Sequence, residues 1–301
     1  MNTSKYKVFL KVAELGSITR AAQELNYTQS GVSQIISSLE RELGFPLLVR
    51  TKAGTALTSS GERVLEPIRQ IVKWEGSLQQ IATSILGLET GMIRVGTFVS
   101  VSTQWLPPIM REFSALHPNI QFELVSGDYD DISQMLLENR LDCGFLSRLS
   151  SEGLEFTHLL HDDYVVLLPK DHPYAHVEYF TYDMLNGQPF IVPTDELDFD
   201  LAPLLKNRNL DLNITYRIKE DYTVISMVEH GLGISVLPKL LLEDLRNEVV
   251  VKPFSDSYSR DLGIAVRSFE YITPPTRAFM DFVTEWVRDH YDRPQGLTQA
   301  F

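Results

Sequence analysis

The chain is poor in cysteine. Cys143 is its single cysteine among 301 residues, so the chain cannot form an internal disulfide and a redox role has no partner thiol within it. The surrounding residues 141–145 are largely apolar, which predicts a buried strand with Cys143 as a small core residue.

Long apolar runs are also missing. None approaches the ~20 residues that a bilayer-spanning helix needs. Residues 1–5 lead directly into an amphipathic pattern, without the apolar core of a signal peptide. From the sequence we therefore expect a cytoplasmic protein with no membrane partner.

Motifs of catalysis and cofactor binding are absent. The sequence holds no G-x-S-x-G, H-E-x-x-H, C-x-x-C or G-x-x-x-x-G-K. Gly231-x-Gly233 lacks the third glycine and the acidic partner of a dinucleotide site, which favours a simple turn. We expect neither enzyme activity nor a bound cofactor.

Histidines cluster in one segment. Four of the seven lie within nineteen positions: His158, His161, His172 and His176. Their spacing does not place two on one helical turn beside carboxylates, as a helical zinc site would, so we expect histidines at the surface or at strand ends and no metal site. The adjacent Asp162-Asp163 pair is predicted to lie in a hairpin turn.

Positive charge is scarce but unevenly distributed. The net charge is −13, yet residues 1–58 carry seven Lys and Arg against four Glu, a balance of +3 that leaves −16 for the remainder. A small basic head on a large acidic body suits a DNA-binding module joined to a domain that must not touch DNA. Because the head is only mildly basic, we expect two copies to act together.

Two short helical patterns separated by a two-residue break stand in that basic head. The apolar positions are Ile18, Ala21, Ala22 and Leu25, then, after Asn26-Tyr27, Val32, Ile35, Ile36, Leu39 and Leu43. This spacing predicts a helix-turn-helix, with Thr28 as N-cap of the second helix. Residues 47–50 and 56–58 flank a polar turn and predict a two-stranded wing, whose Arg50 and Lys52 reach phosphate or the minor groove.

A dense set of motifs runs through roughly the first 65 residues: Phe9-x-x-Val12-Ala13-Glu14-x-Gly16-Ser17-x-Thr19-x-Ala21-Ala22-x-x-Leu25, Thr28-Gln29-Ser30-x-Val32-Ser33, Leu39-Glu40-x-x-Leu43-Gly44, Leu47-x-x-Arg50 and Leu57-Thr58-x-x-Gly61. This string resembles the N-terminal domain of LysR-type transcriptional regulators. The resemblance implies that Gln29, Ser30, Ser33 and Gln34 face the major groove. The full set expected at DNA is Ser17, Thr28, Gln29, Ser30, Ser33, Gln34, Ser37, Arg50 and Lys52.

This second helix departs from many relatives. It has Gly31 near its start and no Arg or Lys before Arg41. Base specificity is therefore expected to be modest, with more of it depending on DNA shape and bending.

A long helix is predicted next, over about residues 60–86, opened by an S-x-x-E capping box at Ser59 and Glu62. It carries a coiled-coil spacing interrupted by one charge: Val64, Ile68, Ile71, Glu75, Leu78, Ala82 and Ile85. At ~1.5 Å per residue it is about 40 Å long. Pro67 lies beyond the first turn and is expected to kink or interrupt the helix there. An ordinary core helix is the alternative, whereas the LysR resemblance implies a dimerisation linker and a homodimer or homotetramer.

From residue 91 onward, strand and helix patterns alternate. Strands are predicted at 92–96, 120–125 and 141–146, with helices at 103–116 and 132–139, and the pattern breaks at 156–169. It resumes with strands at 190–193, 214–219 and 234–237 and helices at 201–207 and 224–229. A returning strand at 263–267 and a helix at 276–291 follow. This layout is similar to the periplasmic-binding-protein-like effector domain of the LysR type.

The expected fold is α+β overall: an N-terminal all-α winged helix-turn-helix, a long linker helix and a C-terminal two-lobed α/β domain. The predicted boundaries are 1–58 for the DNA-binding domain, 59–90 for the linker and hinge, and 91–301 for the effector domain. Within the last, lobe I takes 91–162 and 267–301, and lobe II takes 163–266.

The predicted ligand site lies where strands end in the cleft expected between these lobes. Residues 97–103 hold four hydroxyls ahead of a helix, and helix N-termini bind anions, so a carboxylate or phosphate metabolite is the expected effector. The candidate residues are Thr97, Phe98, Ser100, Val101, Ser102, Gly127, Asp128, Phe145, Ser147, Arg148, Pro193 and Thr194. Asp128, Asp130 and Asp131 leave recognition of an amino group, or simple solvation, open.

The sequence thus indicates a DNA-binding regulator whose partners are promoter DNA, further copies of itself and a small metabolite, with RNA polymerase as a further candidate. Two alternatives remain at this point. One is a solute-binding protein or enzyme built on the same α/β body, and the other is an architectural DNA binder that needs no ligand.

Overall fold

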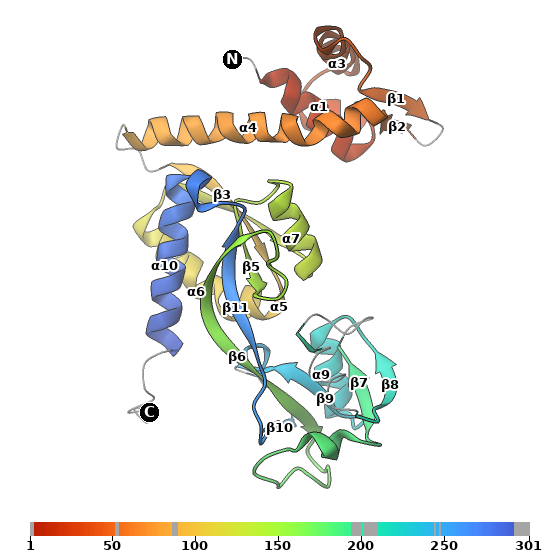
Figure 1. Ribbon diagram of the computed structural model, residues 1–301, viewed down its shortest axis with the longest axis vertical. Helices are drawn as coiled ribbons and strands as arrows, with labels where there is room; N and C mark the ends of the chain where they lie inside the picture. The colour runs from red at the N-terminus through yellow and green to blue at the C-terminus, as the bar shows by residue number, and fades with distance from the viewer. Residues whose placement is uncertain are drawn as a thin grey trace. The chain divides into compact units, whose positions relative to one another are not determined.

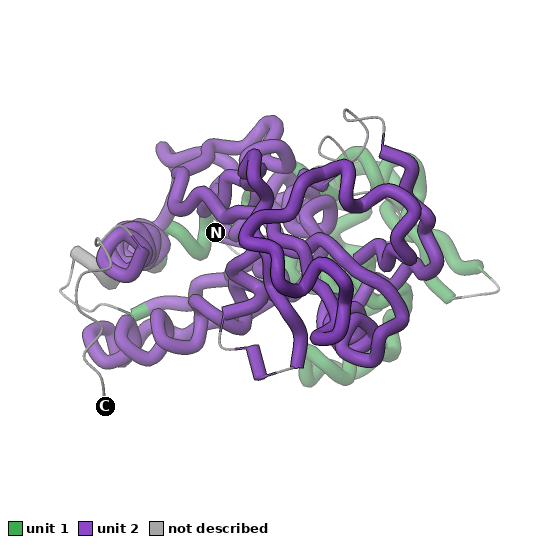
Figure 2. The backbone as a smooth tube through the Cα atoms, turned by 90° about the horizontal axis from the view of Figure 1, so that it is seen from below, with its two compact units in different colours: residues 1–90 green, residues 91–301 purple. Residues whose placement is uncertain are grey.

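The computed structural model describes residues 3–51, 54–85, 90–193, 200–201, 210–243, 245–246 and 248–291. The chain divides into two compact units, residues 1–90 and 91–301, each described by itself (Figures 1 and 2). Within the described ranges, no helix combines the length and apolar character required to cross a membrane.

Unit 1 is a three-helix domain with a wing and a long helix. Its elements are α1 (Ser4–Leu15), α2 (Ile18–Glu24), α3 (Gln29–Leu43), β1 (Leu48–Thr51), β2 (Gly54–Leu57) and α4 (Ser59–Ile85). Its core joins α1, α2 and α3 to the wing through Phe9, Val12, Val32, Leu39 and Leu47. The helical periods therefore correctly predicted α2 and α3, and the two short runs on either side of the polar turn correctly predicted the wing strands.

Two expectations for α4 are wrong. Pro67 does not interrupt the helix, which is continuous from Ser59 to Ile85. Val64, Leu65 and Ile68 pack into the unit 1 core on both sides of the proline, and this packing offsets the hydrogen bond that proline cannot donate. The cap is Thr58 rather than Ser59: the Thr58 hydroxyl accepts from the Gly61 amide at 2.9 Å.

Unit 2 is built on a seven-stranded mixed sheet in the order β10-β6-β11-β5-β3-β4, with β9 also paired to β6. Its strands are β3 (Gly91–Thr97), β4 (Ile120–Ser126), β5 (Cys143–Ser147), β6 (Glu155–Pro169), β9 (Ser235–Pro238), β10 (Val249–Pro253) and β11 (Ser259–Val266), with β7 (Pro189–Val192) and β8 (Asn213–Arg217) in a separate parallel pair. As predicted, Cys143 is buried in a strand.

Helices of unit 2 pack against these strands and join them. They are α5 (Val99–Gln104), α6 (Leu106–Leu116), α7 (Tyr129–Leu137), α9 (Asp221–Glu229) and α10 (Pro274–Tyr291), with the 3₁₀ turns η1 (Tyr182–Leu185), η2 (Lys239–Leu242) and η3 (Phe269–Tyr271). The single helix expected at 103–116 is two helices, because Pro107 and Pro108 open α6 and disfavour continuing α5 into it. The helix expected at 201–207 lies almost wholly outside the described residues.

The segment 156–169, expected to break the pattern, is the interior of the long strand β6 (Figure 1). Residues 155–163 pair with β11, and residues 164–169 pair with β9 and β10. Asp162 and Asp163 are therefore not in a hairpin turn; they lie where β6 passes from one set of partners to the other.

The partner change of β6 divides unit 2 into two lobes with separate cores. One core centres on Trp105, Phe113 and Phe279, and the other on Phe180, Phe190 and Phe254. Strand β11, expected in lobe II as far as residue 266, pairs with β5 along residues 262–265 and so belongs to the sheet of the first lobe.

Candidate DNA-binding and effector-binding sites

The N-terminus of α3 is shaped by Thr28. Its hydroxyl accepts from the Gly31 amide at 3.0 Å and lies 3.2 Å from the Ser30 hydroxyl. A Cβ at position 31 would lie 3.1 Å from the same hydroxyl, so glycine leaves space for the Thr28 side chain. The departure at position 31 thus avoids a tight contact with the N-cap of α3.

One face of α3 is polar and open. Gln29, Ser30, Gln34 and Ser37 are exposed and Ser33 is half-buried, while Val32, Ile36 and Leu39 on the opposite face are buried. Ser17 caps α2 by accepting from the Arg20 amide at 3.3 Å, so its hydroxyl already has a structural contact. The structure therefore brings most of the predicted DNA-facing side chains together on one exposed face.

Hydrogen bonds from side chains to the backbone hold the start of the wing, and those of Glu40 tie it to α3. One carboxylate oxygen of Glu40 accepts from the amides of Leu47 and Leu48, at 2.7 and 3.2 Å. The Thr58 hydroxyl donates to the Pro46 carbonyl at 2.8 Å. These bonds position strand β1, which carries the exposed Arg50 opposite Thr55 in the ladder. Lys52 lies outside the described residues.

Several cations of the basic head are engaged in ion pairs. Lys5 pairs with Glu42, Lys7 with Glu75, and Lys11 with Glu14 and Glu24. The Glu14 hydrogen bond is the main reason that the pKa of Lys11 is raised. Arg20 and Arg50 have no ion pair within the described ranges and are exposed, which adds Arg20, missed from the sequence, to the candidate DNA contacts.

The apolar stripe of α4 differs from the predicted one. Glu75 turns to Lys7, at 2.8 Å, so its charge does not interrupt the exposed face. The exposed large apolar side chains are Ile71, Trp74, Leu78 and Ile81. They follow steps of three and four, so the face is continuous through Trp74 and Ile81 instead of Glu75 and Ala82.

Arg260 is the centre of a polar network in unit 2. It donates to Asp162 at 2.7 Å, to the Tyr129 hydroxyl at 2.9 Å and to the Ser100 hydroxyl at 2.8 Å. The side chains of Arg260 and Asp162 are only 6% and 2% exposed. Burial works against the charge, but Tyr129 and Asp162 outweigh it and hold the pKa of Arg260 above its usual value.

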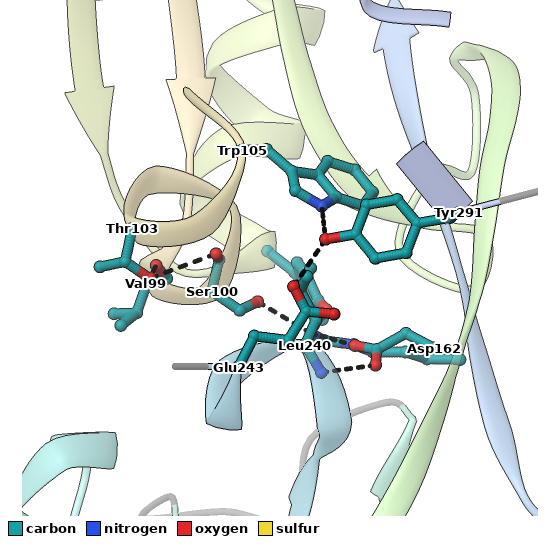
Figure 3. A network of polar contacts seen from close by, with 10 residues as sticks. Val99, Ser100, Thr103, Trp105, Asp162, Leu240, Glu243 and Tyr291 are labelled. Atoms are coloured by element: carbon teal, nitrogen blue, oxygen red, sulfur yellow. Dashed lines mark hydrogen bonds and ion pairs between the residues drawn. The ribbon is translucent and has the colours of Figure 1, made fainter. Parts of the chain in front are cut away.

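This network joins the two lobes. Asp162 also accepts from the Leu240 amide of η2 at 2.9 Å. A second chain of bonds leads from Trp105 to the Tyr291 hydroxyl at 3.0 Å and on to Glu243 at 2.7 Å (Figure 3). Burial and Glu243 raise the pKa of Tyr291 above its ordinary value. Sequence analysis missed Arg260 entirely, because no local pattern marks it.

Several predicted ligand residues are buried or already make contacts within the protein. Thr97, Val101, Phe145 and Ser147 are buried, with Val101 and Phe145 in the core beside Trp105. Ser102 donates its hydroxyl to the Val99 carbonyl at 3.0 Å and Ser100 accepts from Arg260. Phe98 lies at the start of α5, with its ring under Arg260 at 5.3 Å.

The remaining ligand candidates lie at other strand ends. The Gly127 amide donates to the Thr97 carbonyl at 3.1 Å. Asp128 caps α7 and pairs with Lys219 of the second lobe at 3.2 Å. Arg148 is exposed over the Phe156 ring. Pro193 follows β7, and Thr194 is outside the described residues.

Together, a winged helix-turn-helix with a long helix and a two-lobed α/β unit define a transcription regulator that carries a DNA-binding part and a ligand-binding part. Two family descriptions match the chain: "Bacterial regulatory helix-turn-helix protein, lysR family" over residues 3–62 and "LysR substrate binding domain" over residues 86–288. The chain belongs to the LysR family of transcription regulators, which confirms the resemblance, the fold class and the expectation of a regulator rather than an enzyme.

Individual proteins agree with this assignment. The chain is 31% identical over 288 residues to the uncharacterized HTH-type transcriptional regulator YvbU of Bacillus subtilis (strain 168), covering 95% of this chain and 98% of the relative. A full-length OxyR variant from Pseudomonas aeruginosa has the same fold, with a TM-score of 0.76, 21% identity and coverage of 100% and 99%. Full-length CbnR in complex with its target DNA gives a TM-score of 0.66 at 19% identity, over 95% and 100% of the two chains.

Proposed function

We propose that α3 and the wing bind promoter DNA, with α3 in the major groove. The observation that carries this proposal is the exposed polar face of α3 opposite its buried apolar face. Glutamine side chains there can bond an adenine edge, while Arg20 and Arg50 supply phosphate contacts. Because α3 has no cation before Arg41, sequence preference depends in large part on DNA shape.

Fluorescence anisotropy on fragments from upstream regions of the source genome tests this proposal. The variant Gln34→Glu places a negative charge on the exposed α3 face, and Gln121→Glu makes the same change at an exposed position of β4 in unit 2. We expect salt-sensitive binding to a few fragments by the parent chain and by Gln121→Glu, and loss of that binding in Gln34→Glu. Equal binding by both variants would remove α3 from the interface.

The proposed active form is a homodimer or a homotetramer assembled through α4. Ile71, Trp74, Leu78 and Ile81 form an exposed apolar stripe with the spacing that pairs helices. A paired α4 also doubles the weak basic charge of a single DNA-binding head. RNA polymerase is a further proposed partner, reached once the oligomer is bound at a promoter.

Sedimentation velocity with a matched pair of variants tests the oligomer. Leu78 and Leu116 are similarly exposed leucines, on α4 and at the end of α6. Leu78→Glu is expected to convert the assembly to smaller species and to weaken DNA binding, whereas Leu116→Glu leaves both unchanged. A parent chain that sediments as a monomer, or an unaltered Leu78→Glu assembly, contradicts the proposal.

A small anionic metabolite is the proposed effector, bound at the start of α5 beside the network that joins the lobes. Phe98 supplies no side-chain cap there, and the buried positive charge of Arg260 lies over its ring. Recognition of an amino group by Asp128 has less support, because that carboxylate already caps α7 and pairs with Lys219.

The proposed first lobe comprises residues 91–163 and 259–301, and the proposed second lobe comprises residues 164–258.

Thermal unfolding in the presence of a panel of small carboxylates and phosphate esters tests the effector class. At least one anion should raise the melting temperature of the parent chain and of Ser257→Asp, an exposed turn variant, but not that of Ser102→Asp. Amines that stabilise the protein where anions do not would overturn the choice of class. Stabilisation by neither group would favour a DNA binder that needs no ligand.

A further inference from the structure

Two histidines and a carboxylate meet on the exposed side of the β6–β11 pair. They are His158 and His161 on β6 and Asp261 on β11. Their ligand atoms all lie within 4.8 Å of one another. His161 Nδ1 is 2.5 Å from Asp261 Oδ1, and His158 Nε2 is 3.8 Å from the same oxygen.

A β-bulge places both histidines on one face. In a regular strand, residues three apart point to opposite faces. Here Leu262 pairs with Leu160 and Gly263 pairs with His158, so Leu159 is an extra residue in the ladder. The extra residue inverts the alternation and turns His158 to the side of His161. A Cβ at Gly263 would overlap Phe156 and the Thr157 carbonyl, so glycine is required at this bulge.

The opposite face of the same strands carries the buried Arg260–Asp162 pair, so the cluster is separate from that network. The exposed fractions of the side chains of His158, His161 and Asp261 are 43%, 69% and 42%. An ion in solution therefore has direct access to all three. Asp261 has no Lys or Arg ion pair within the described ranges, so its charge is available to a cation.

We propose that His158, His161 and Asp261 bind a divalent transition-metal ion such as Zn²⁺. Imidazole nitrogen with one carboxylate oxygen is a ligand set that suits zinc and its neighbours in the first transition row, whereas Mg²⁺ and Ca²⁺ prefer oxygen alone. Three protein ligands leave a coordination position for water. Small rotations of exposed side chains suffice to bring the ligand atoms to metal-binding distance.

The position of this site gives it a consequence for the whole unit. His161 and Asp261 are paired residues on β6 and β11, and only two residues beyond His161 the strand β6 changes partners from one lobe to the other. A bound ion crosslinks the two strands next to that change. Metal binding thereby stiffens the connection between the lobes, independently of any anion at α5.

Isothermal titration of the full-length chain with ZnCl₂, after removal of metals by a chelator, tests the site. The parent chain should bind one Zn²⁺ per chain, and His158→Ala, His161→Ala and Asp261→Asn should each weaken binding by about 10-fold or more. His176→Ala, which removes an exposed histidine elsewhere, is the matched control and should bind as the parent does. Circular dichroism checks that each variant is folded.

Two further measurements make the result unambiguous. Co²⁺ in place of Zn²⁺ should give visible absorption bands in the parent chain that Asp261→Asn alters, because the carboxylate is then lost as a ligand. In metal-free buffer, the three variants should bind DNA as the parent does, so failure of the metal site is distinct from failure of the DNA proposal. No stoichiometric binding, or an equal loss of affinity in His176→Ala, would overturn the assignment.

Discussion

The two units differ in the sequence separation of the residues whose hydrogen bonds position their candidate sites. In unit 1 the contacts that place the proposed DNA-binding residues are short-range: Thr28 bonds Gly31, Glu40 bonds Leu47, and Thr58 bonds Pro46. In unit 2 Arg260 lies 98 positions from Asp162 and 160 from Ser100. The proposed DNA-binding residues are thus placed by contacts between residues close in sequence, whereas the lobes are joined by a buried charge network that no local pattern reveals.

The largest expected effect is in unit 2. Asp162→Ala leaves Arg260 buried without its carboxylate, which should lower the free energy of unfolding by about 3–5 kcal/mol. Urea unfolding measures this loss. The adjacent, exposed Asp163 is the control, since Asp163→Ala should change stability by no more than about 0.5 kcal/mol. Similar losses in the two variants would mean that the buried pair is not what joins the lobes.

A smaller effect is expected where the wing meets α4. A Cβ at Gly61 would overlap the Leu47 carbonyl oxygen, so Gly61→Ala should cost about 1–3 kcal/mol and displace the wing. Gly76→Ala in the same helix meets no atom within 4 Å and should instead stabilise by about 0.5–1 kcal/mol. Thermal unfolding of the two variants should therefore shift in opposite directions, and a shift in the same direction would refute the close approach.

The N-cap of α3 tests whether contacts between residues close in sequence position the DNA-binding face of unit 1. Thr28→Ala removes the acceptor of the Gly31 amide and should cost about 1 kcal/mol. The same change should loosen the first turn of α3 and weaken DNA binding. Urea unfolding with anisotropy on the same sample measures both quantities, and an unchanged DNA affinity would show that the first turn does not reach DNA.

Arg20 tests which cations contact phosphate. Arg20→Ala should weaken DNA binding at every sequence and reduce the slope of log affinity against log salt by about 1. Lys5→Ala removes a cation already paired with Glu42 and should leave the slope nearly unchanged. Anisotropy titrations at several salt concentrations separate the two, and equal slopes would remove Arg20 from the interface.

The smallest effect concerns pH. The Asp131 amide, with help from Lys219, holds the pKa of Asp128 below its ordinary value although burial opposes this. Because the folded chain favours the charged form of Asp128, this carboxylate contributes to the free energy of unfolding. The contribution is complete above pH ~4, near the pKa of Asp in the unfolded chain, and is lost as the pH falls through the lower pKa of the folded chain. The loss should stay under about 1 kcal/mol, since the Lys219 pair is exposed. Urea unfolding from pH 6 to 3 should show this component in the parent and not in Asp128→Asn.

The difference in sequence separation also explains which helices and strands could be predicted from the sequence. Helix periods and caps placed α2 and α3 within a residue or two, because each signal lies inside the element that it defines. Strand β6 was missed because the bulge at Leu159 inverts the alternation that identifies a strand. The stripe of α4 was misassigned at Glu75, since its partner Lys7 lies in another helix.

The candidate sites follow the same division. The polar face of α3 was predicted from spacing and family resemblance. Arg20 was missed because the sequence does not show which of the Lys and Arg side chains in unit 1 form ion pairs with Glu. A metal site at the clustered histidines was rejected on helical spacing, whereas the metal site proposed here joins residues of two strands about 100 positions apart. Only the fold brings such residues together.

Chemical footprinting of a bound upstream fragment tests most directly whether α3 lies in the major groove, with one probe for guanine N7 in that groove and one for the DNA backbone. We expect two protected half-sites centred a whole number of helical turns apart, with N7 protection that Gln34→Glu loses and Gln121→Glu retains. Backbone protection alone, without N7 protection in either half-site, would contradict the placement of α3 in the major groove.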